Sequence, residues 1–192
     1  MADPRSRPAL FLDRDGVVNE EIAYLHRPED VRLVAGVAGA IAQANAAGIP
    51  VVVVTNQAGI ARGLYGEADL AAVGARIAAL LAPAVLAATY HCPHHPEARV
   101  TALRVVCDCR KPAPGLLLRA ARDHGLDLGR SFLVGDKASD LGAARAAGCG
   151  SVLVRTGYGA ATEREVEGAG LHDAVFDTLA AAMPYLLARL TA

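Results

Sequence analysis

The sequence is poor in the features that mark membrane, exported and nucleic-acid-binding proteins. It has no tryptophan, an aromatic content of 4% and a formal net charge of −1. It has no basic tract and no stretch that interleaves basic with aromatic residues, so we expect no nucleic-acid partner. No apolar run approaches the length of a membrane span, and no signal-like apolar segment follows the short polar N-terminus, 1–8. We therefore expect a cytoplasmic protein with no membrane partner.

Cysteine is also scarce, with four residues in 192. Without an export signal, a disulfide framework is not expected. Three of the cysteines lie close together in the sequence, which favours metal binding. Cys149 stands apart, and we expect it to be a small buried residue. Hydrophobic residues make up 53% of the chain and charged residues 20%, which is enough to fold one domain of ordinary size.

Strand-like apolar segments alternate with helix-like segments along the whole chain. We expect strands at 9–12, 49–54, 84–90, 131–134, 151–154 and 174–176, and helices at 37–47, 67–81, 114–124, 140–147 and 178–189. This alternation predicts an α/β fold, doubly wound around a mostly parallel sheet. We find no repeat, linker or second domain, so residues 1–192 are expected to form a single domain.

Polar side chains stand at the ends of three of these predicted strands. The pairs are Asp13 and Asp15, Thr55 and Asn56, and Asp136 and Lys137. The carboxyl ends of parallel strands share one edge of the sheet, where ligands bind. Carboxylates there can hold Mg²⁺, and one of them can attack an electrophile. Asp-x-Asp-Gly alone is also a common turn sequence, but three such strand endings together favour a functional site.

Four motifs, in this order along the chain, resemble those of the haloacid dehalogenase-like phosphatases. They are Asp13-Arg14-Asp15-Gly16, Thr55-Asn56, Lys111 and Gly135-Asp136-Lys137-Ala138-Ser139-Asp140. The resemblance implies a Rossmann-like fold and magnesium-dependent hydrolysis of a phosphomonoester. Asp13 would attack phosphorus to form an aspartyl-phosphate, and Asp15 would act as general acid and base. The chain has no room for a large cap domain between the first two motifs.

The same resemblance implies the roles of the remaining polar residues. Magnesium would be held by the carboxylate of Asp13, the backbone carbonyl of Asp15 and Asp136. Thr55, Asn56 and Lys111 would bind the oxygens of the transferred phosphoryl group. Lys137 and Asp140 would support the metal and phosphate site, although Lys137 also reads as a solvated loop residue and Asp140 as a helix cap.

The segment 91–110 is rich in histidine, cysteine and proline and has little periodicity. Two short pairs, Cys92 with His94 and Cys107 with Cys109, offer three thiolates and one imidazole, the closed ligand set of structural Zn²⁺. His91 and His95 are competing ligands, with His95 better read as a polar loop residue. The alternative is a loop of reduced thiols and surface histidines. A zinc-stapled loop would position the two residues that follow it, Arg110 and Lys111.

Longer sequences around these motifs resemble a narrower group of phosphatases. Cys-Pro-His-His-Pro, Cys-Asp-Cys-Arg-Lys-Pro and Val-Thr-Asn-Gln-Ala-Gly-Ile-Ala-Arg-Gly are similar to the D-glycero-D-manno-heptose-1,7-bisphosphate 7-phosphatases and the histidinol-phosphate phosphatases. Asn19 and Tyr24 favour the heptose enzymes, which act in the biosynthesis of nucleotide-activated heptose for lipopolysaccharide and other bacterial surface polysaccharides. In such an enzyme Asn19, Tyr24, Arg110 and Lys137 would join the phosphate-binding residues in contacting substrate, with Arg110 on the distal phosphate.

The expected partner is therefore a small phosphorylated sugar, bound by a monomer. The alternative substrate is histidinol phosphate. A nucleic-acid 3′-end phosphatase and a non-catalytic phosphate-binding module are weaker alternatives. The first lacks its basic surface, and the second leaves the complete set of catalytic positions unexplained.

Overall fold

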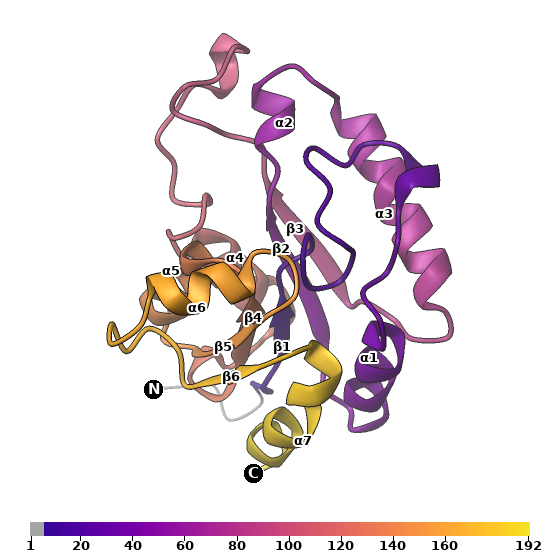
Figure 1. The fold of residues 1–192 in the computed structure, drawn as a ribbon, viewed down its shortest axis with the longest axis vertical. Coiled ribbons are helices and arrows are strands. Elements are labelled where there is room, and N and C mark those ends of the chain that lie inside the picture. Colours follow the sequence, from indigo (N-terminus) through magenta and orange to yellow (C-terminus); the bar gives the residue numbers. More distant parts are fainter. Residues whose placement is uncertain (1–5) are drawn as a thin grey trace.

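A single six-stranded parallel sheet organises the computed structural model, which describes residues 6–192 (Figure 1). The strand order is β3-β2-β1-β4-β5-β6, and every pair of neighbours is parallel. The strands are β1 (Leu10–Leu12), β2 (Val51–Asn56), β3 (Ala88–Cys92), β4 (Phe132–Gly135), β5 (Gly150–Val154) and β6 (Ala174–Phe176). The chain leaves β1 toward β2 and later returns to its other side with β4, so the order reverses beside β1. A reversal of this kind opens a crevice at the carboxyl ends of the strands.

Helices cover both faces of this sheet. They are α1 (Val37–Ala46), α2 (Ala58–Ala61), α3 (Glu67–Leu81), α4 (Gly115–His124), α5 (Ala138–Ala147), α6 (Gly159–Glu165) and α7 (Leu179–Leu190). Short 3₁₀ turns are η1 (Pro28–Asp30), η2 (Thr101–Leu103) and η3 (Leu128–Arg130). Figure 1 shows α1, α3 and α7 on one side and α4, α5 and α6 on the other. The doubly wound α/β prediction is confirmed, and the sheet is parallel throughout the described residues.

The two faces of the sheet bury alternate residues of the same strands. Leu10 and Leu12 belong to the core beneath α1, α3 and α7, whereas Phe11 belongs to the core beneath α4 and α5. All three side chains are fully buried. This two-sided burial explains why the strands read as continuous apolar runs, since neither face meets water. Cys149 is buried with the second core, as expected.

Several element boundaries differ from the sequence-based expectation. The strand expected at 84–90 begins only at Ala88, where it pairs with Val52, and continues to Cys92. Two helices lie where none was expected: the short α2, between the strand at 49–54 and the helix at 67–81, and α6. Of the polar N-terminal segment, residues 1–5 lie outside the described part of the chain. Between residues 6 and 192, no helix is long and apolar enough to cross a membrane.

Candidate active site

Three buried carboxylates meet at the crevice between the ends of β1 and β4. Asp13 follows β1, Asp136 follows β4, and Asp140 lies in the first turn of α5. Their side chains are almost completely buried, and one oxygen of each lies within 4.8 Å of the others. The structure thus brings Asp13 and Asp136 together as predicted and adds Asp140 to the acidic group. Asp140 also accepts a hydrogen bond from the Lys137 backbone N–H at 3.0 Å, so it caps α5 as well.

A buried cation, Lys111, contacts this acidic group. Its Nζ forms ion pairs with Asp13 Oδ1 at 2.9 Å and Asp140 Oδ1 at 2.6 Å, and it donates to the Val54 carbonyl at 2.8 Å. Burial alone would lower the pKa of Lys111, but the carboxylates of Asp13 and Asp140 raise it above its ordinary value. Lys111 therefore stays an ammonium ion at neutral pH, although it is almost fully buried.

The amide of Asn56 fixes the backbone on which Lys111 stands. Asn56 Nδ2 donates to the Lys111 carbonyl at 3.1 Å, and the Lys111 backbone N–H donates to Asn56 Oδ1 at 3.0 Å. This reciprocal pair joins the end of β2 to a segment 55 residues further along the chain. Asn56 was predicted to contact phosphate, and in this structure its amide positions the lysine.

The charge of the acidic group exceeds what Lys111 neutralises, and the pKa values reflect this. Burial raises the pKa of Asp13 to about 6, with a further upward contribution from Asp140. Burial raises the pKa of Asp136 to about 7, with a further upward contribution from Asp13. Asp136 Oδ1 is buried and has no hydrogen-bond partner within residues 6–192. A crowded carboxylate cluster with an unpaired oxygen fits a hard divalent cation such as Mg²⁺.

Two glycines leave the space that Asp136 occupies. A Cβ on Gly16 or on Gly157 would lie 2.2 Å from Asp136 Oδ2, and both glycines have positive φ angles. Oδ2 instead accepts a hydrogen bond from the Tyr158 backbone N–H at 2.9 Å. The glycine of the first motif thus makes room for the Asp136 carboxylate, and Gly157 does the same from the loop after β5.

Asp15 is not part of this acidic group, and its carboxylate is held by the side chains of three residues. The Arg14 guanidinium donates from Nε to Oδ1 at 3.1 Å and from Nη2 to both carboxylate oxygens at 3.0 Å. Asn19 Nδ2 donates to Oδ1 at 2.9 Å, and Gln57 Nε2 donates to Oδ2 at 3.0 Å. Asn19 was predicted to contact substrate. It is fully buried behind Asp15, so in this structure it positions the carboxylate.

A polar cleft of about 310 Å³ opens beside Asp15. It is lined by Arg14, Asp15, Asn56, Lys137, by the segment Glu21–Leu25 that carries Tyr24, and by Gln57, Ala58, Gly59, Tyr65 and Tyr158. Lys137 forms an ion pair with Glu21 at 2.8 Å and lies over the Tyr158 ring, 4.7 Å from its centre. Tyr24 and Lys137 therefore line the cleft, as a substrate contact must. Thr55 is almost fully buried, and its hydroxyl accepts a hydrogen bond from Gln57.

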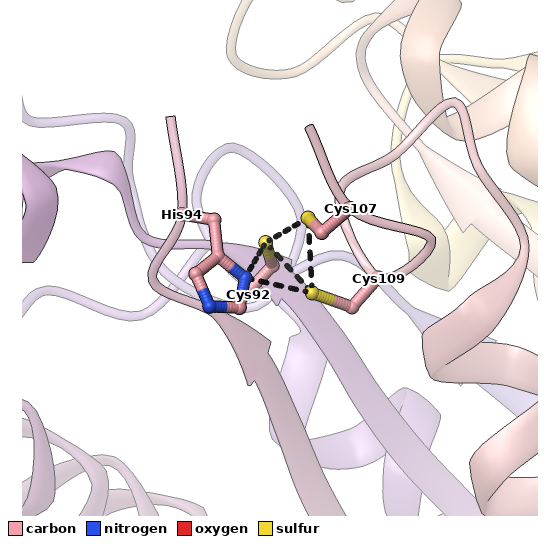
Figure 2. Close-up of side chains that lie close together, drawn as sticks. All are labelled: Cys92, His94, Cys107 and Cys109. Carbon is pink, nitrogen blue, oxygen red and sulfur yellow. Dashed lines mark hydrogen bonds between the residues drawn. The ribbon is translucent and has the colours of Figure 1, made fainter. Parts of the chain in front are cut away.

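The four predicted zinc ligands, which all belong to the segment 91–110, converge on one another (Figure 2). The Cys109 sulfur lies 3.1 Å from that of Cys92, 3.3 Å from that of Cys107 and 3.2 Å from His94 Nδ1. Cys92 lies 3.6 Å from Cys107 and 3.7 Å from His94 Nδ1. A tetrahedral site with Zn–S bonds of about 2.3 Å has sulfur–sulfur edges of about 3.8 Å. The cluster has the ligand types and nearly the size of such a site, and all four cysteines are free of disulfides.

The two competing histidines lie outside this cluster. His91 forms an ion pair with Glu67, and His95 accepts a hydrogen bond from the Glu97 backbone N–H. Burial raises the pKa of the Cys109 thiol, and the neighbouring thiols Cys92 and Cys107 raise it further. Thiolates this close repel one another, so the cluster needs a cation to be stable when ionised.

Two arginines lie near the end of the segment 91–110, and neither is among the residues that line the cleft. Arg110 donates to the His94 carbonyl at 3.3 Å, which ties its side chain to the ligand cluster. Burial lowers the pKa of His95, and the guanidinium groups of Arg110 and Arg62 lower it further. Arg62 lies 5.9 Å from the centre of the Tyr24 ring, and its Nε is buried without a hydrogen-bond partner in the described chain. Arg62 was not named as a candidate site residue from the sequence, although it lies in the Gly-Ile-Ala-Arg-Gly stretch.

Comparisons with known proteins agree with this geometry. A family model described as HAD-hydrolase-like matches residues 108–182. A D-glycero-D-manno-heptose-1,7-bisphosphate 7-phosphatase of Thermosynechococcus vestitus is 45% identical over 194 residues, covering 96% of this chain and 97% of the relative. A D-glycero-beta-D-manno-heptose-1,7-bisphosphate 7-phosphatase of Escherichia coli is 45% identical over 165 residues, covering 84% and 86%.

Solved structures give the same result. The crystal structure of a D,D-heptose 1,7-bisphosphate phosphatase from B. bronchiseptica, complexed with magnesium and phosphate, matches with a TM-score of 0.83 and 39% identity. The match covers 94% of this chain and 98% of the B. bronchiseptica chain. A HAD-like phosphatase from Mesorhizobium loti matches with a TM-score of 0.82 and 37% identity, covering 100% of this chain and 89% of that one.

Proposed function

Because the chain belongs to the haloacid dehalogenase-like phosphatases, in the group of D-glycero-D-manno-heptose-1,7-bisphosphate 7-phosphatases, we propose that it removes the 7-phosphate of D-glycero-D-manno-heptose 1,7-bisphosphate. The observation that carries this proposal is the buried centre of Asp13, Asp136, Asp140 and Lys111 at the sheet edge, next to a polar cleft. The chain is a phosphatase of heptose biosynthesis, and this geometry supports the residue roles proposed below.

Asp13 is the proposed nucleophile. Its Oδ1 is held by Lys111 Nζ and by the Arg14 backbone N–H at 2.7 Å, which fixes the carboxylate and leaves Oδ2 free of donors within the described chain. Lys111 counteracts the burial that raises the pKa of Asp13, so it helps keep the carboxylate ionised. Attack on phosphorus would give an aspartyl-phosphate and release the sugar alcohol.

Asp15 is the proposed general acid and base. It lies on the cleft side of the site, where the leaving oxygen of a bound sugar would lie. It would protonate that oxygen and then take a proton from the water that hydrolyses the aspartyl-phosphate. Thr55 and Lys111 would donate to the phosphoryl oxygens, where fixed donors and positive charge stabilise the transferring group.

Magnesium would be held by Asp13 and Asp136, with the backbone carbonyl of Asp15 as a third ligand and Asp140 close by. When bound, it would neutralise charge on the phosphoryl group and orient that group for attack. We also propose that Cys92, His94, Cys107 and Cys109 hold a structural Zn²⁺. We also propose that the protein acts as a single-domain monomer built around its one six-stranded sheet.

Arg110 is the proposed ligand of the distal phosphate, and Arg62 adds a second guanidinium beside His95. Two arginines favour a second phosphate over the ammonium and imidazole of histidinol phosphate. Tyr24 and Lys137, which line the cleft, would contact the sugar between the two phosphates.

A phosphate-release assay with heptose 1,7-bisphosphate, histidinol phosphate and fructose 1,6-bisphosphate tests the substrate. We expect the highest kcat/KM for the heptose compound, and a preference for histidinol phosphate would overturn that assignment. Asp13→Asn should abolish hydrolysis while phosphate still binds. Substantial turnover by this variant would remove Asp13 from the nucleophile's role.

A further inference from the structure

Gln57 connects two groups of the proposed reaction that come from different strands. Its Nε2 donates to Asp15 Oδ2 at 3.0 Å and to Thr55 Oγ1 at 2.9 Å. Arg14 and Asn19 also hold Asp15, but both belong to the same loop as Asp15. Gln57 is the donor that ties this loop to the end of β2, across 42 residues of sequence. Its side chain is 3% exposed, so water competes little for these bonds.

The direction of the Gln57 amide is set by Tyr65. The Tyr65 hydroxyl donates to Gln57 Oε1 at 2.5 Å. Burial raises the pKa of Tyr65 to about 12, so the hydroxyl keeps its proton at neutral pH and remains a donor. With Oε1 engaged by Tyr65, Nε2 must face the two acceptors. An amide turned the other way would place Oε1 against the Asp15 carboxylate, where two acceptors repel each other.

Tyr65 is itself fixed from two sides. A Cβ on Gly59 would lie 2.0 Å from a carbon of the Tyr65 ring, so this ring position requires glycine in α2. The His26 ring stacks on the Tyr65 ring, with 5.7 Å between ring centres and 4° between planes. His26 in turn contacts the Tyr24 carbonyl through Nδ1 at 2.8 Å. The tyrosine therefore lies between α2 and the segment that lines the cleft.

The hydrogen bond to Thr55 has a consequence for its hydroxyl. A hydroxyl has one proton to donate, and here its oxygen already accepts from Gln57. Its own proton is then available for an acceptor on the other side, and the acceptor expected there is a phosphoryl oxygen. One amide would thus orient both the Thr55 donor and the Asp15 carboxylate.

We propose that Gln57, oriented by Tyr65, is a positioning residue that aligns the general acid Asp15 with the leaving oxygen and Thr55 with the phosphoryl group. This inference rests on the proposed function of Asp13 and Asp15. Neither Gln57 nor Tyr65 reacts, so their removal should lower kcat for sugar phosphates and leave KM nearly unchanged. The distal-phosphate ligand Arg110 is not part of this network.

The decisive experiment compares two leaving groups in Tyr65→Phe. A sugar alkoxide leaves only when it is protonated, whereas the p-nitrophenolate of p-nitrophenyl phosphate leaves without protonation. The quantity compared is kcat/KM, because it reports formation of the aspartyl-phosphate and not its hydrolysis, a step that both substrates share. We expect kcat/KM for heptose bisphosphate to fall about tenfold, the equivalent of about 1.4 kcal/mol in the transition state. We expect kcat/KM for p-nitrophenyl phosphate to change less than twofold. The ratio of the two rates does not depend on how much of the preparation is folded.

Tyr90→Phe is the matched control. It removes a hydroxyl that donates to Asp123 at 3.0 Å, an exposed contact of the outermost strand β3. Both rates should therefore match those of the unchanged protein. Gln57→Glu replaces the Nε2 donor with an oxygen that faces Asp15. We expect a larger loss of activity than in Tyr65→Phe, and again the loss should be greater on the sugar phosphate than on p-nitrophenyl phosphate. Equal losses on both substrates in Tyr65→Phe and Gln57→Glu would overturn the positioning role.

Asp15→Asn separates this inference from the proposed function. If Asp15 is the general acid, this variant should show a far larger fall in kcat/KM for the sugar phosphate than for p-nitrophenyl phosphate. If it does so while Tyr65→Phe and Gln57→Glu do not, the positioning role fails and the acid assignment stands. If Asp15→Asn shows no such preference, the acid assignment fails and the positioning inference fails with it.

Discussion

The crowding of Asp13, Asp136 and Asp140 predicts that the magnesium-free protein loses stability as the pH rises. Folding raises the pKa of Asp136 from 3.8 to about 7. Between those two values the folded state binds more protons than the unfolded state. The contribution of this group to the free energy of unfolding is therefore fully present below pH 3.8 and is lost as the pH rises through about 7.

The change in the free energy of unfolding depends on how much of the interval from pH 3.8 to about 7 the experiment covers. One pH unit within the window changes the free energy of unfolding by about 1.4 kcal/mol. Between pH 5 and pH 8 the group at about 7 titrates over two such units, which gives a loss of about 3 kcal/mol. Asp13 is not added, because its pKa shift and that of Asp136 share the same mutual repulsion.

Urea unfolding at pH 5 and pH 8 measures this loss when the unchanged protein is compared with Asp136→Asn. The difference in free energy of unfolding between the two should shift by about 3 kcal/mol in favour of the variant at pH 8. Any pH dependence of the zinc loop cancels, since both proteins carry it. Saturating Mg²⁺ should stabilise the unchanged protein at pH 8 and leave the variant almost unaffected. If the difference in free energy of unfolding between the two proteins is constant from pH 5 to pH 8, folding does not raise the pKa of Asp136, and the reasoning fails.

Three further changes test other parts of the site. Lys111→Met leaves two buried carboxylates without their cation. Urea denaturation at neutral pH should therefore show that the free energy of unfolding falls by about 3–5 kcal/mol. An unchanged urea midpoint would refute the buried ion pairs. Gly157→Ala places a Cβ 2.2 Å from a metal-site carboxylate oxygen, and we expect kcat to fall about a hundredfold, as for a displacement of about 1 Å. Its control is Gly168→Ala, where φ is also positive but no atom lies within 4 Å of the added Cβ, and kcat should not change. Cys109→Ser should release zinc and raise KM for the bisphosphate, with zinc content measured by metal analysis. Cys149→Ser should retain zinc, and a zinc-free variant with unchanged KM would exclude the loop from substrate binding.

Much of the fold could be predicted, because strand and helix periodicities differ and glycines mark the helix ends. Gly48 and Gly148 follow helices and have positive φ angles, as expected for helix stops. The limits of β3 could not be predicted in the same way. Residues 84–87 are as apolar as a strand, but pairing with β2 starts only at Ala88, and pairing depends on a partner distant in sequence.

The helix α6 illustrates a second kind of miss. The segment Gly159–Glu165 shows little apolar periodicity, and only Gly159 and Thr162 are buried. Its position depends on a close approach to β5, since a Cβ on Gly159 would lie 1.6 Å from the Val154 carbonyl oxygen. A glycine that permits close packing looks in sequence like any other turn glycine, so this helix had no readable signal.

The sequence named the candidate reacting groups that the structure places at this site, but it did not indicate which groups orient them. Charged residues at strand ends stand out because a buried charge needs a reason, and their shared edge follows from parallel topology. Asn19 and Gln57 are neutral amides, and nothing in their local sequence says whether they face substrate or a neighbouring carboxylate. For Gln57, that choice is made by Tyr65 and by the room that Gly59 leaves for the tyrosine ring beside α2. Asn19 was consequently assigned to the substrate and Gln57 was overlooked, although both bond to the same aspartate. Where a strand end supplies an acid, the amides near it are best treated as candidates for its orientation before they are assigned to the ligand.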